Sequence, residues 1–144
     1  KLIVGGDTLI FNYKIEDDFI TLNSNNSKLL NDNLKYDGLV QLDPFDLVLD
    51  IDSKQFDYNK FLSINSFFQE VLKTNLLFNK NINAKISFTI KDILNNKLFD
   101  NLIILLNFNN GDINFDKSYL LNNKIGKLSL DYGKILNNKN QLIF

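Results

Sequence analysis

The sequence predicts a mainly β fold: a curved antiparallel sheet, arranged as a meander, a β-groove or a partial barrel, with one helix around residues 58–75 packed on it or capping it. Two observations predict this class. Apolar and polar residues alternate with the period of a strand in most segments, and only one segment departs from that period toward helical spacing. The chain has 144 residues, 44% of them apolar, so we expect residues 1–144 to form a single β-rich domain with its own core.

Nine segments show the alternation of a strand: 8–15, 18–24, 34–42, 45–52, 84–92, 102–108, 111–118, 124–133 and 141–144. In FDLVLDID (45–52), the residues expected on one face are Phe45, Leu47, Leu49 and Ile51. In AKISFTIKD (84–92), the corresponding residues are Ile86, Phe88 and Ile90. Connectors rich in Asn, Asp and Ser separate the strands at 23–27, 31–33, 122–123 and 137–138, and we expect turns there because Asn tolerates positive φ.

The helix is predicted in DYNKFLSINSFFQEVLKTNLL (57–77), where Phe61, Ile64, Phe68 and Val71 recur near helical spacing. Segment 102–106, LIILL, is apolar on both faces. A strand of that kind needs cover on both sides. We expect the helix on one side and either a second sheet layer or a bound apolar ligand on the other.

The composition excludes several kinds of chemistry. The net charge is −1, with 16 basic and 17 acidic residues, so no electrostatic attraction favours nucleic acid or an anionic membrane surface. The chain has no His, Cys or Arg. It therefore has no ordinary zinc ligands, thiol nucleophile, disulfide or imidazole base, and no bidentate clamp for phosphate. Catalysis by a Ser/Lys pair or by paired carboxylates stays open on composition alone, and a hydrolase of that kind is a third alternative. Because no residue pattern favours it, we expect no enzyme activity, no catalytic residues, no metal and no cofactor.

NFNNGDINFDKS (107–118) has the composition of a calcium loop but not its pattern. With Gly111 at the sixth position of an EF-hand loop, the first position is Leu106 and the twelfth is Lys117, and neither residue supplies a carboxylate there. Asn110-Gly111 between two alternating segments is instead typical of a β-hairpin turn. We predict a hairpin.

Two sets of polar residues are candidate sites. Asp43, Asp46, Asp50 and Asp52 form an acidic row that could hold calcium or supply an acid and a base. Lys85 and Lys91 flank Ser87 and Thr89 on one strand face. A serine and a lysine on the same face could form a catalytic Ser-Lys dyad. Both rows alternate with core residues, so a solvated sheet face is the preferred interpretation.

The apolar strand faces exceed what one short helix can cover. Such a face is either closed by a second layer, as an ordinary core, or is a groove for an apolar ligand. The residues that would line a lipid groove are Phe45, Leu47, Leu49, Ile51, Ile86, Phe88, Ile90, Leu102, Ile104, Leu106, Phe108, Ile113, Phe115, Leu128, Leu130 and Tyr132.

Segments 36–65, 79–93 and 101–130 together resemble the C-terminal region of AsmA-like proteins, which are related to the β-groove envelope proteins of Gram-negative bacteria. NNGDINFDKSYL (109–120) is similar to a strand-ending phrase that recurs in that family. The resemblance implies a periplasmic, non-enzymatic module that is lipid-binding through a β-groove. It further implies a role in lipid transport or outer membrane biogenesis, and partners that are lipid acyl chains and neighbouring β-domains of the same longer chain.

On this resemblance we expect the chain to be a fragment of an envelope protein that is inner membrane-anchored through a segment outside it. The alternative from the residues alone is a structural or adhesive β-sandwich repeat of a surface protein, which calcium would stabilise.

Overall fold

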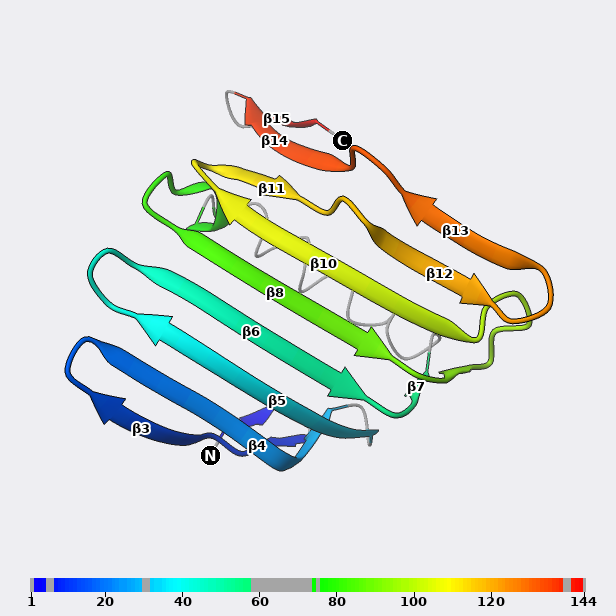
Figure 1. The fold of residues 1–144 in the computed structure, drawn as a ribbon, viewed down its shortest axis with the longest axis horizontal. Coiled ribbons are helices and arrows are strands. Elements are labelled where there is room, and N and C mark those ends of the chain that lie inside the picture. Colours follow the sequence, from blue (N-terminus) through cyan, green and yellow to red (C-terminus); the bar gives the residue numbers. More distant parts are fainter. Residues whose placement is uncertain are drawn as a thin grey trace.

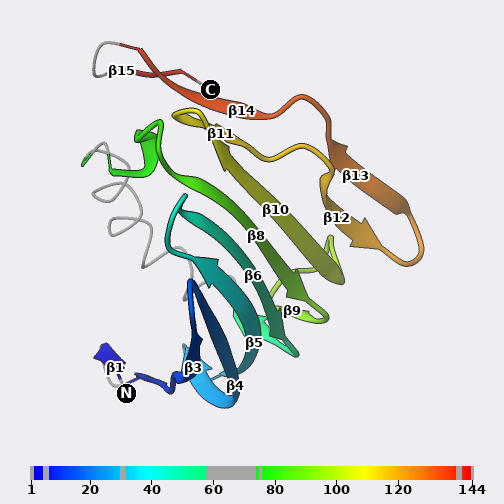
Figure 2. The same ribbon diagram turned by 60° about the vertical axis from the view of Figure 1, so that its left-hand side comes forward.

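The structure is a computed structural model that describes residues 2–4, 7–29, 32–57, 74, 76–138 and 141–143. It confirms the mainly β fold class, with a curved sheet that does not close into a barrel (Figures 1 and 2). The strands of the first half are β1 (Leu2–Val4), β2 (Asp7–Leu9), β3 (Asn12–Glu16), β4 (Phe19–Leu29), β5 (Asp32–Gln41), β6 (Asp46–Ser53) and β7 (Phe56–Asp57). A short 3₁₀ helix, η1 (Leu76–Phe78), precedes β8 (Asn83–Ile90), β9 (Ile93–Leu94), β10 (Asn101–Asn109), β11 (Asp112–Asn114), β12 (Ser118–Asn122), β13 (Gly126–Leu130), β14 (Lys134–Asn138) and β15 (Gln141–Ile143).

Eleven strands form one large mixed sheet. Its order is β15-β14-β11-β10-β8-β6-β5-β4-β3, and β12 also pairs with β10 and carries β13 on its other side. Two small two-stranded sheets, β1-β2 and β7-β9, accompany it. In the large sheet all pairs are antiparallel except β6-β8, which is parallel. The sequence predicted a mainly antiparallel sheet and did not identify this parallel pair, because alternation within a strand does not reveal the direction of its neighbour.

The parallel pair requires a crossover connection between β6 and β8. The described part of this connection contacts the sheet at both ends of these strands. Phe56 of β7 packs with Ile90 and Ile93, and Phe78 of η1 packs with Ala84, Phe108 and Ile113. The predicted helix lies outside the described residues, since residues 58–73 and 75 are not among them. Of the helices that the structure describes, none is long and apolar enough to cross a membrane.

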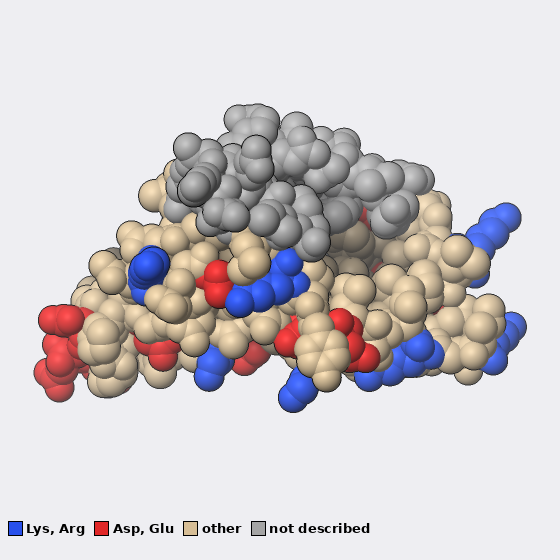
Figure 3. All heavy atoms as spheres, turned by 90° about the horizontal axis from the view of Figure 1, so that it is seen from above, with Lys and Arg blue, Asp and Glu red and all other residues tan. Residues whose placement is uncertain are grey.

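Strand register divides the side chains of the large sheet between two faces. Leu49 of β6 lies beside Ile86 of β8, which lies beside Leu106 of β10; we call this side the apolar face. Asp50 lies beside Ser87, and Ser87 beside Leu105, on the opposite side, which we call the polar face. Figure 3 shows Asp, Glu and Lys side chains along the lower side of the molecule, where the polar face lies.

Several predicted connectors and strand ends differ from the structure. Residues 23–27 were predicted as a turn, but they lie within β4, where the register shifts between Ser24 and Ser27. The predicted strand 8–15 is divided at Ile10 and Phe11. The hydroxyl of Ser27 accepts a hydrogen bond from the Ile10 amide at 2.9 Å and contacts the Ser24 hydroxyl at 2.9 Å. Ser24 and Ser27 are buried, and through these contacts they attach the segment between β2 and β3 to the bulge in β4. The polar residues 23–27 are therefore part of the sheet and do not form a turn.

The C-terminal third has more strands than predicted. Segment 111–118 was predicted as one strand, but β11 ends at Asn114 and β12 begins at Ser118. Residues 137–138 were predicted as a connector and instead belong to β14. The segment between β11 and β12 turns because Asn114 Oδ1 accepts a hydrogen bond from the Asp116 amide at 2.8 Å and Lys117 has a φ of 65°, which are typical of an Asx turn.

Candidate functional site

The candidate site is the apolar face, which is continuous over the strands from β3 to β13. In the centre, paired residues of β6, β8 and β10 are Leu, Ile and Phe. The face extends through Leu120 of β12 to Leu128 of β13 on one side. On the other side it extends through Tyr36 of β5 and Leu22 of β4 to Tyr13 of β3. Among the described residues, this arrangement places apolar side chains along one side of an open sheet.

Side-chain exposure is highest at the two edges of this face. Tyr13 and Ile15 on β3 are 68% and 62% exposed, and Leu128 and Leu130 on β13 are 54% and 48% exposed. The central residues, such as Leu49, Ile86 and Ile104, are half-buried. Exposed apolar side chains therefore lie at both edges of the face, and the residues between them are half-buried or belong to the two core clusters. Exposed apolar side chains that are gathered in a patch are typical of an interaction site.

The polar side chains set into the apolar face are engaged in internal hydrogen bonds. Ser53 Oγ donates to the Gln55 carbonyl at 2.6 Å, and the Tyr36 hydroxyl donates to the Ile10 carbonyl. Ser118 Oγ lies 2.9 Å from the Leu105 amide, which donates to it where β10 passes the gap between β11 and β12. With these groups used to hold strands together, recognition on this face relies on apolar contact.

Most of the residues predicted to line a groove lie on this face. Strand register places there Leu47, Leu49, Ile51, Ile86, Phe88, Ile90, Leu102, Ile104, Leu106, Phe108, Ile113, Leu128 and Leu130. Among them, Ile90, Phe108 and Ile113 are buried in the two core clusters. These three are core residues that a ligand could not reach without displacing their neighbours.

Three of the predicted lining residues lie outside the strands. Phe45 belongs to the turn before β6, and Phe115 follows the end of β11, where it packs against Gly133. The prediction for Tyr132 is wrong: it is 93% exposed, lies beyond the end of β13 and has a φ of 64°. In each case the alternation of the sequence extends beyond the strand, before its start at Phe45 and after its end at Phe115 and Tyr132.

The structure also adds residues that the sequence reasoning did not assign to the face. They are Tyr13, Ile15, Ile20, Leu22, Leu34, Tyr36, Val40, Leu120 and Ile135. Their segments had been predicted as strands in part, and their alternation was visible. What was missing was the cross-strand register, which decides which of the two alternating sets faces the same side as Leu49.

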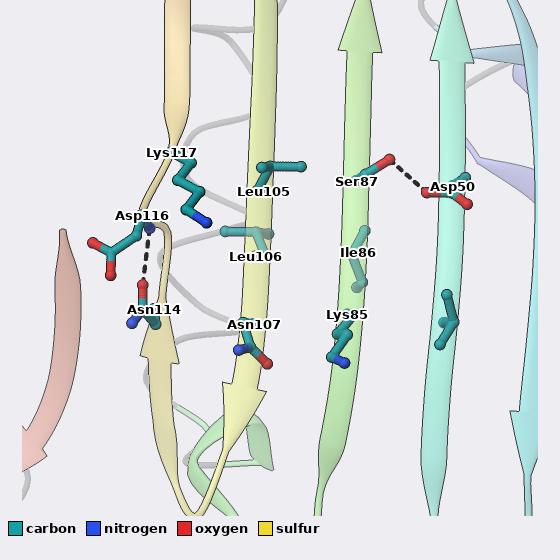
Figure 4. Close-up of a pocket in the computed structure, with 11 residues that line it drawn as sticks. Asp50, Lys85, Ile86, Ser87, Leu105, Leu106, Asn107, Asn114, Asp116 and Lys117 are labelled. Carbon is teal, nitrogen blue, oxygen red and sulfur yellow. Dashed lines mark hydrogen bonds between the residues drawn. The ribbon is translucent and has the colours of Figure 1, made fainter. Parts of the chain in front are cut away.

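A shallow groove of about 510 Å³ lies elsewhere, mainly on the polar face, between β6 and the turn that follows β11. Figure 4 shows Lys85, Ser87, Asp50 and Leu105 along it. Ser87 Oγ donates to Asp50 Oδ1 at 2.6 Å, so the serine is paired with a carboxylate. That geometry does not arrange a Ser-Lys pair, in which the amine would take the hydroxyl proton.

The groove also lacks a convergent set of ligands. Asn114 Oδ1 is already used by the Asp116 amide, and Figure 4 shows the Asp116 carboxylate directed away from Lys117. Among the residues that the structure describes, no group of three or more acidic side chains is gathered as a metal site. The apolar face therefore remains the stronger candidate.

The hairpin prediction for NFNNGDINFDKS is confirmed. Asn110 and Gly111 form the turn with φ values of 54° and 82°, as a type I′ turn requires. Phe108 pairs with Ile113 across it. A Cβ added to Gly111 would lie 2.8 Å from the Phe78 carbonyl oxygen, so the glycine also allows η1 to approach the turn.

Comparison with known proteins supplies no family: no family model, no curated protein and no solved structure matches this chain.

Proposed function

We propose that this chain is a non-enzymatic envelope module whose apolar sheet face holds lipid acyl chains, in the transport of phospholipid or the assembly of an outer membrane. The observation that carries the proposal is the continuous apolar face of a sheet that remains open. Burial of apolar surface contributes roughly 25 cal/mol for each Å² removed from water, so an acyl chain laid across such a face is stabilised without directed polar contacts.

The open sheet favours this proposal over a β-sandwich repeat. A sandwich packs two sheets face to face at about 10 Å. The described residues contain one large sheet and two two-stranded sheets, and the apolar residues Tyr13, Ile15, Leu128 and Leu130 at the edges β3 and β13 are exposed. Thermal melting with calcium and with a chelator separates the two functions, because a large increase in melting temperature with calcium would favour the adhesive repeat.

The cellular setting of the proposal rests on the resemblance to AsmA-like proteins. On that basis the module faces the periplasm, its membrane anchor belongs to a segment outside this chain, and neighbouring β-domains of the same longer protein extend its sheet. No nucleic acid and no cofactor takes part in the proposed function.

The first test is lipid content. The chain, purified without detergent from bacterial cells, is expected to retain phospholipid that native mass spectrometry and organic extraction both detect. Ile104→Lys on the apolar face is expected to reduce the bound lipid, whereas Ile103→Lys, one residue away on the polar face, is expected to retain it. Circular dichroism checks that both variants are folded. A wild-type chain without bound lipid that also takes up none from vesicles would overturn the proposal.

A further inference from the structure

The strand β13 forms an unpaired edge of the large sheet. It pairs with β12 on one side, and on its other side no strand of the described residues pairs with it (Figure 1). All five of its residues, Gly126–Leu130, are exposed. An edge of this kind presents free backbone donors and acceptors to another strand.

Natural edge strands are often protected by shortness, by lysines, by a proline or by a charged residue pointing to the apolar side. β13 is short and carries Lys127 on its polar side, but it has no proline and no charge on its apolar side. On β13 the apolar-face positions are Gly126, Leu128 and Leu130, and none of them is charged. Leu128 and Leu130 are 54% and 48% exposed, so apolar surface lies directly at the edge.

The strand and the residue that follows it, Asp131, together form a segment that is complementary to itself in the antiparallel direction. In KLSLD (127–131), a two-fold pairing centred on Ser129 places Lys127 opposite Asp131 of the second copy. The same register places Leu128 opposite Leu130 on the apolar face. Opposite charges and apolar pairs directly across from each other each stabilise a strand pair. Lys127 Nζ lies 4.0 Å from the centre of the Tyr119 ring, which holds the ammonium on the polar face.

From this edge and its charge pattern we propose that β13 pairs antiparallel with β13 of a second copy of the chain. The two-fold axis stands perpendicular to the sheet, so both apolar faces lie on the same side and the two sheets become one. Tyr132, with its φ of 64°, turns the chain away directly after Asp131 and limits the paired segment. The inference stands on the edge itself and does not require that the face bind lipid.

The edge strand β3, at the far end of the sheet order from β15, does not have the same pattern. β3 reads NYKIE (12–16), and a two-fold pairing of the whole strand, centred on Lys14, would oppose two lysines. Like charges in that position destabilise a strand pair. Lys14 therefore provides a matched control: it is an exposed lysine on an edge strand that the proposed contact does not include.

Sedimentation velocity of variants in which the charges at positions 127 and 131 are reversed tests the proposal. One strand pair is a small interface, so the wild-type chain is expected to form a weak dimer that is detectable at chain concentrations up to about 1 mM. Lys127→Glu and Asp131→Lys should each weaken dimerisation by about tenfold, since two attractive pairs become repulsive. An equimolar mixture of the two variants should form heterodimers, and the double variant Lys127→Glu/Asp131→Lys should regain the wild-type affinity. Lys14→Glu should leave it unchanged.

A chain that stays monomeric over the whole range of chain concentration overturns the proposal. So does a dimer that is insensitive to both charge variants, or one that Lys14→Glu weakens, because the contact would then lie on another surface. Each substituted side chain is exposed, and a thermal melt of each variant confirms that it is folded before its association is measured.

Discussion

At the residue scale, single positions decide how closely elements approach. Asn110-Gly111 was predicted as a turn because this dipeptide adopts two positive φ values readily, and the structure confirms it. The role of Ser118 could not be predicted in the same way. Its hydroxyl substitutes for a strand partner of Leu105, and this depends on a gap between β11 and β12 that only the folded sheet reveals.

Gly111→Ala is expected to destabilise the chain by about 1–3 kcal/mol, because it combines a strained positive φ with a close contact. The added Cβ would meet the Phe78 carbonyl oxygen at 2.8 Å. Urea denaturation followed by circular dichroism measures the change. Asn110→Gly is the control, and it should be nearly neutral because glycine suits the φ of 54° at that position. Equal losses from both substitutions would contradict the assigned turn.

Ser118→Ala is expected to cost about 1–2 kcal/mol, since it leaves the partly buried Leu105 amide without its acceptor. Ser118 is 2% exposed, so water cannot replace the hydroxyl freely. Ser87→Ala provides the comparison, because its hydrogen bond to Asp50 lies at the surface and its loss should cost less than about 0.5 kcal/mol. Chemical denaturation of the two variants would contradict this account if the ranking were reversed.

At the scale of the element, alternation identified the central strands but not their ends or neighbours. Segments 45–52 and 84–92 correspond closely to β6 and β8. Their parallel pairing was not predicted, because the direction of a strand pair follows from the connection between the strands and leaves no mark on the side-chain pattern within them. β14 was missed because its Asn137 and Asn138 resemble a turn, although the ladder to β15 outweighs that preference.

Hydrogen exchange should follow the position of each strand in the sheet. Backbone amides of β8 and β10, which have strands on both sides, are expected to exchange most slowly, and those of the edge strands, such as β3, more rapidly, since one side of an edge strand is unpaired in the described sheet. Mass spectrometry of deuterium uptake measures the order. Protection of β3 equal to that of β8 would indicate that another strand covers the β3 edge.

The same measurement applies to the proposed pairing of β13 with a second copy. Protection of the β13 amides is expected to rise with chain concentration.

At the scale of the whole molecule, the fold class was predictable and the site was predictable in outline. The excess of apolar residues over what one helix can cover led to the expectation of an apolar surface, and register then placed thirteen of the predicted lining residues on one face. The other three predicted lining residues, Phe45, Phe115 and Tyr132, lie outside the strands, where the chain turns. The alternation of a sequence does not mark where the backbone leaves the strand.

Photocrosslinking at two adjacent isoleucines tests the central claim most directly. Ile104 pairs with Phe88 on the apolar face, and Ile103 pairs with Thr89 on the polar face. Benzoylphenylalanine at Ile104, or at Leu102 or Leu106 on the same face, is expected to crosslink phospholipid in cells, whereas the same group at Ile103 is expected to give none. Equal crosslinking at Ile103 and Ile104, or none at any position on the apolar face, would contradict a lipid-binding role for that face.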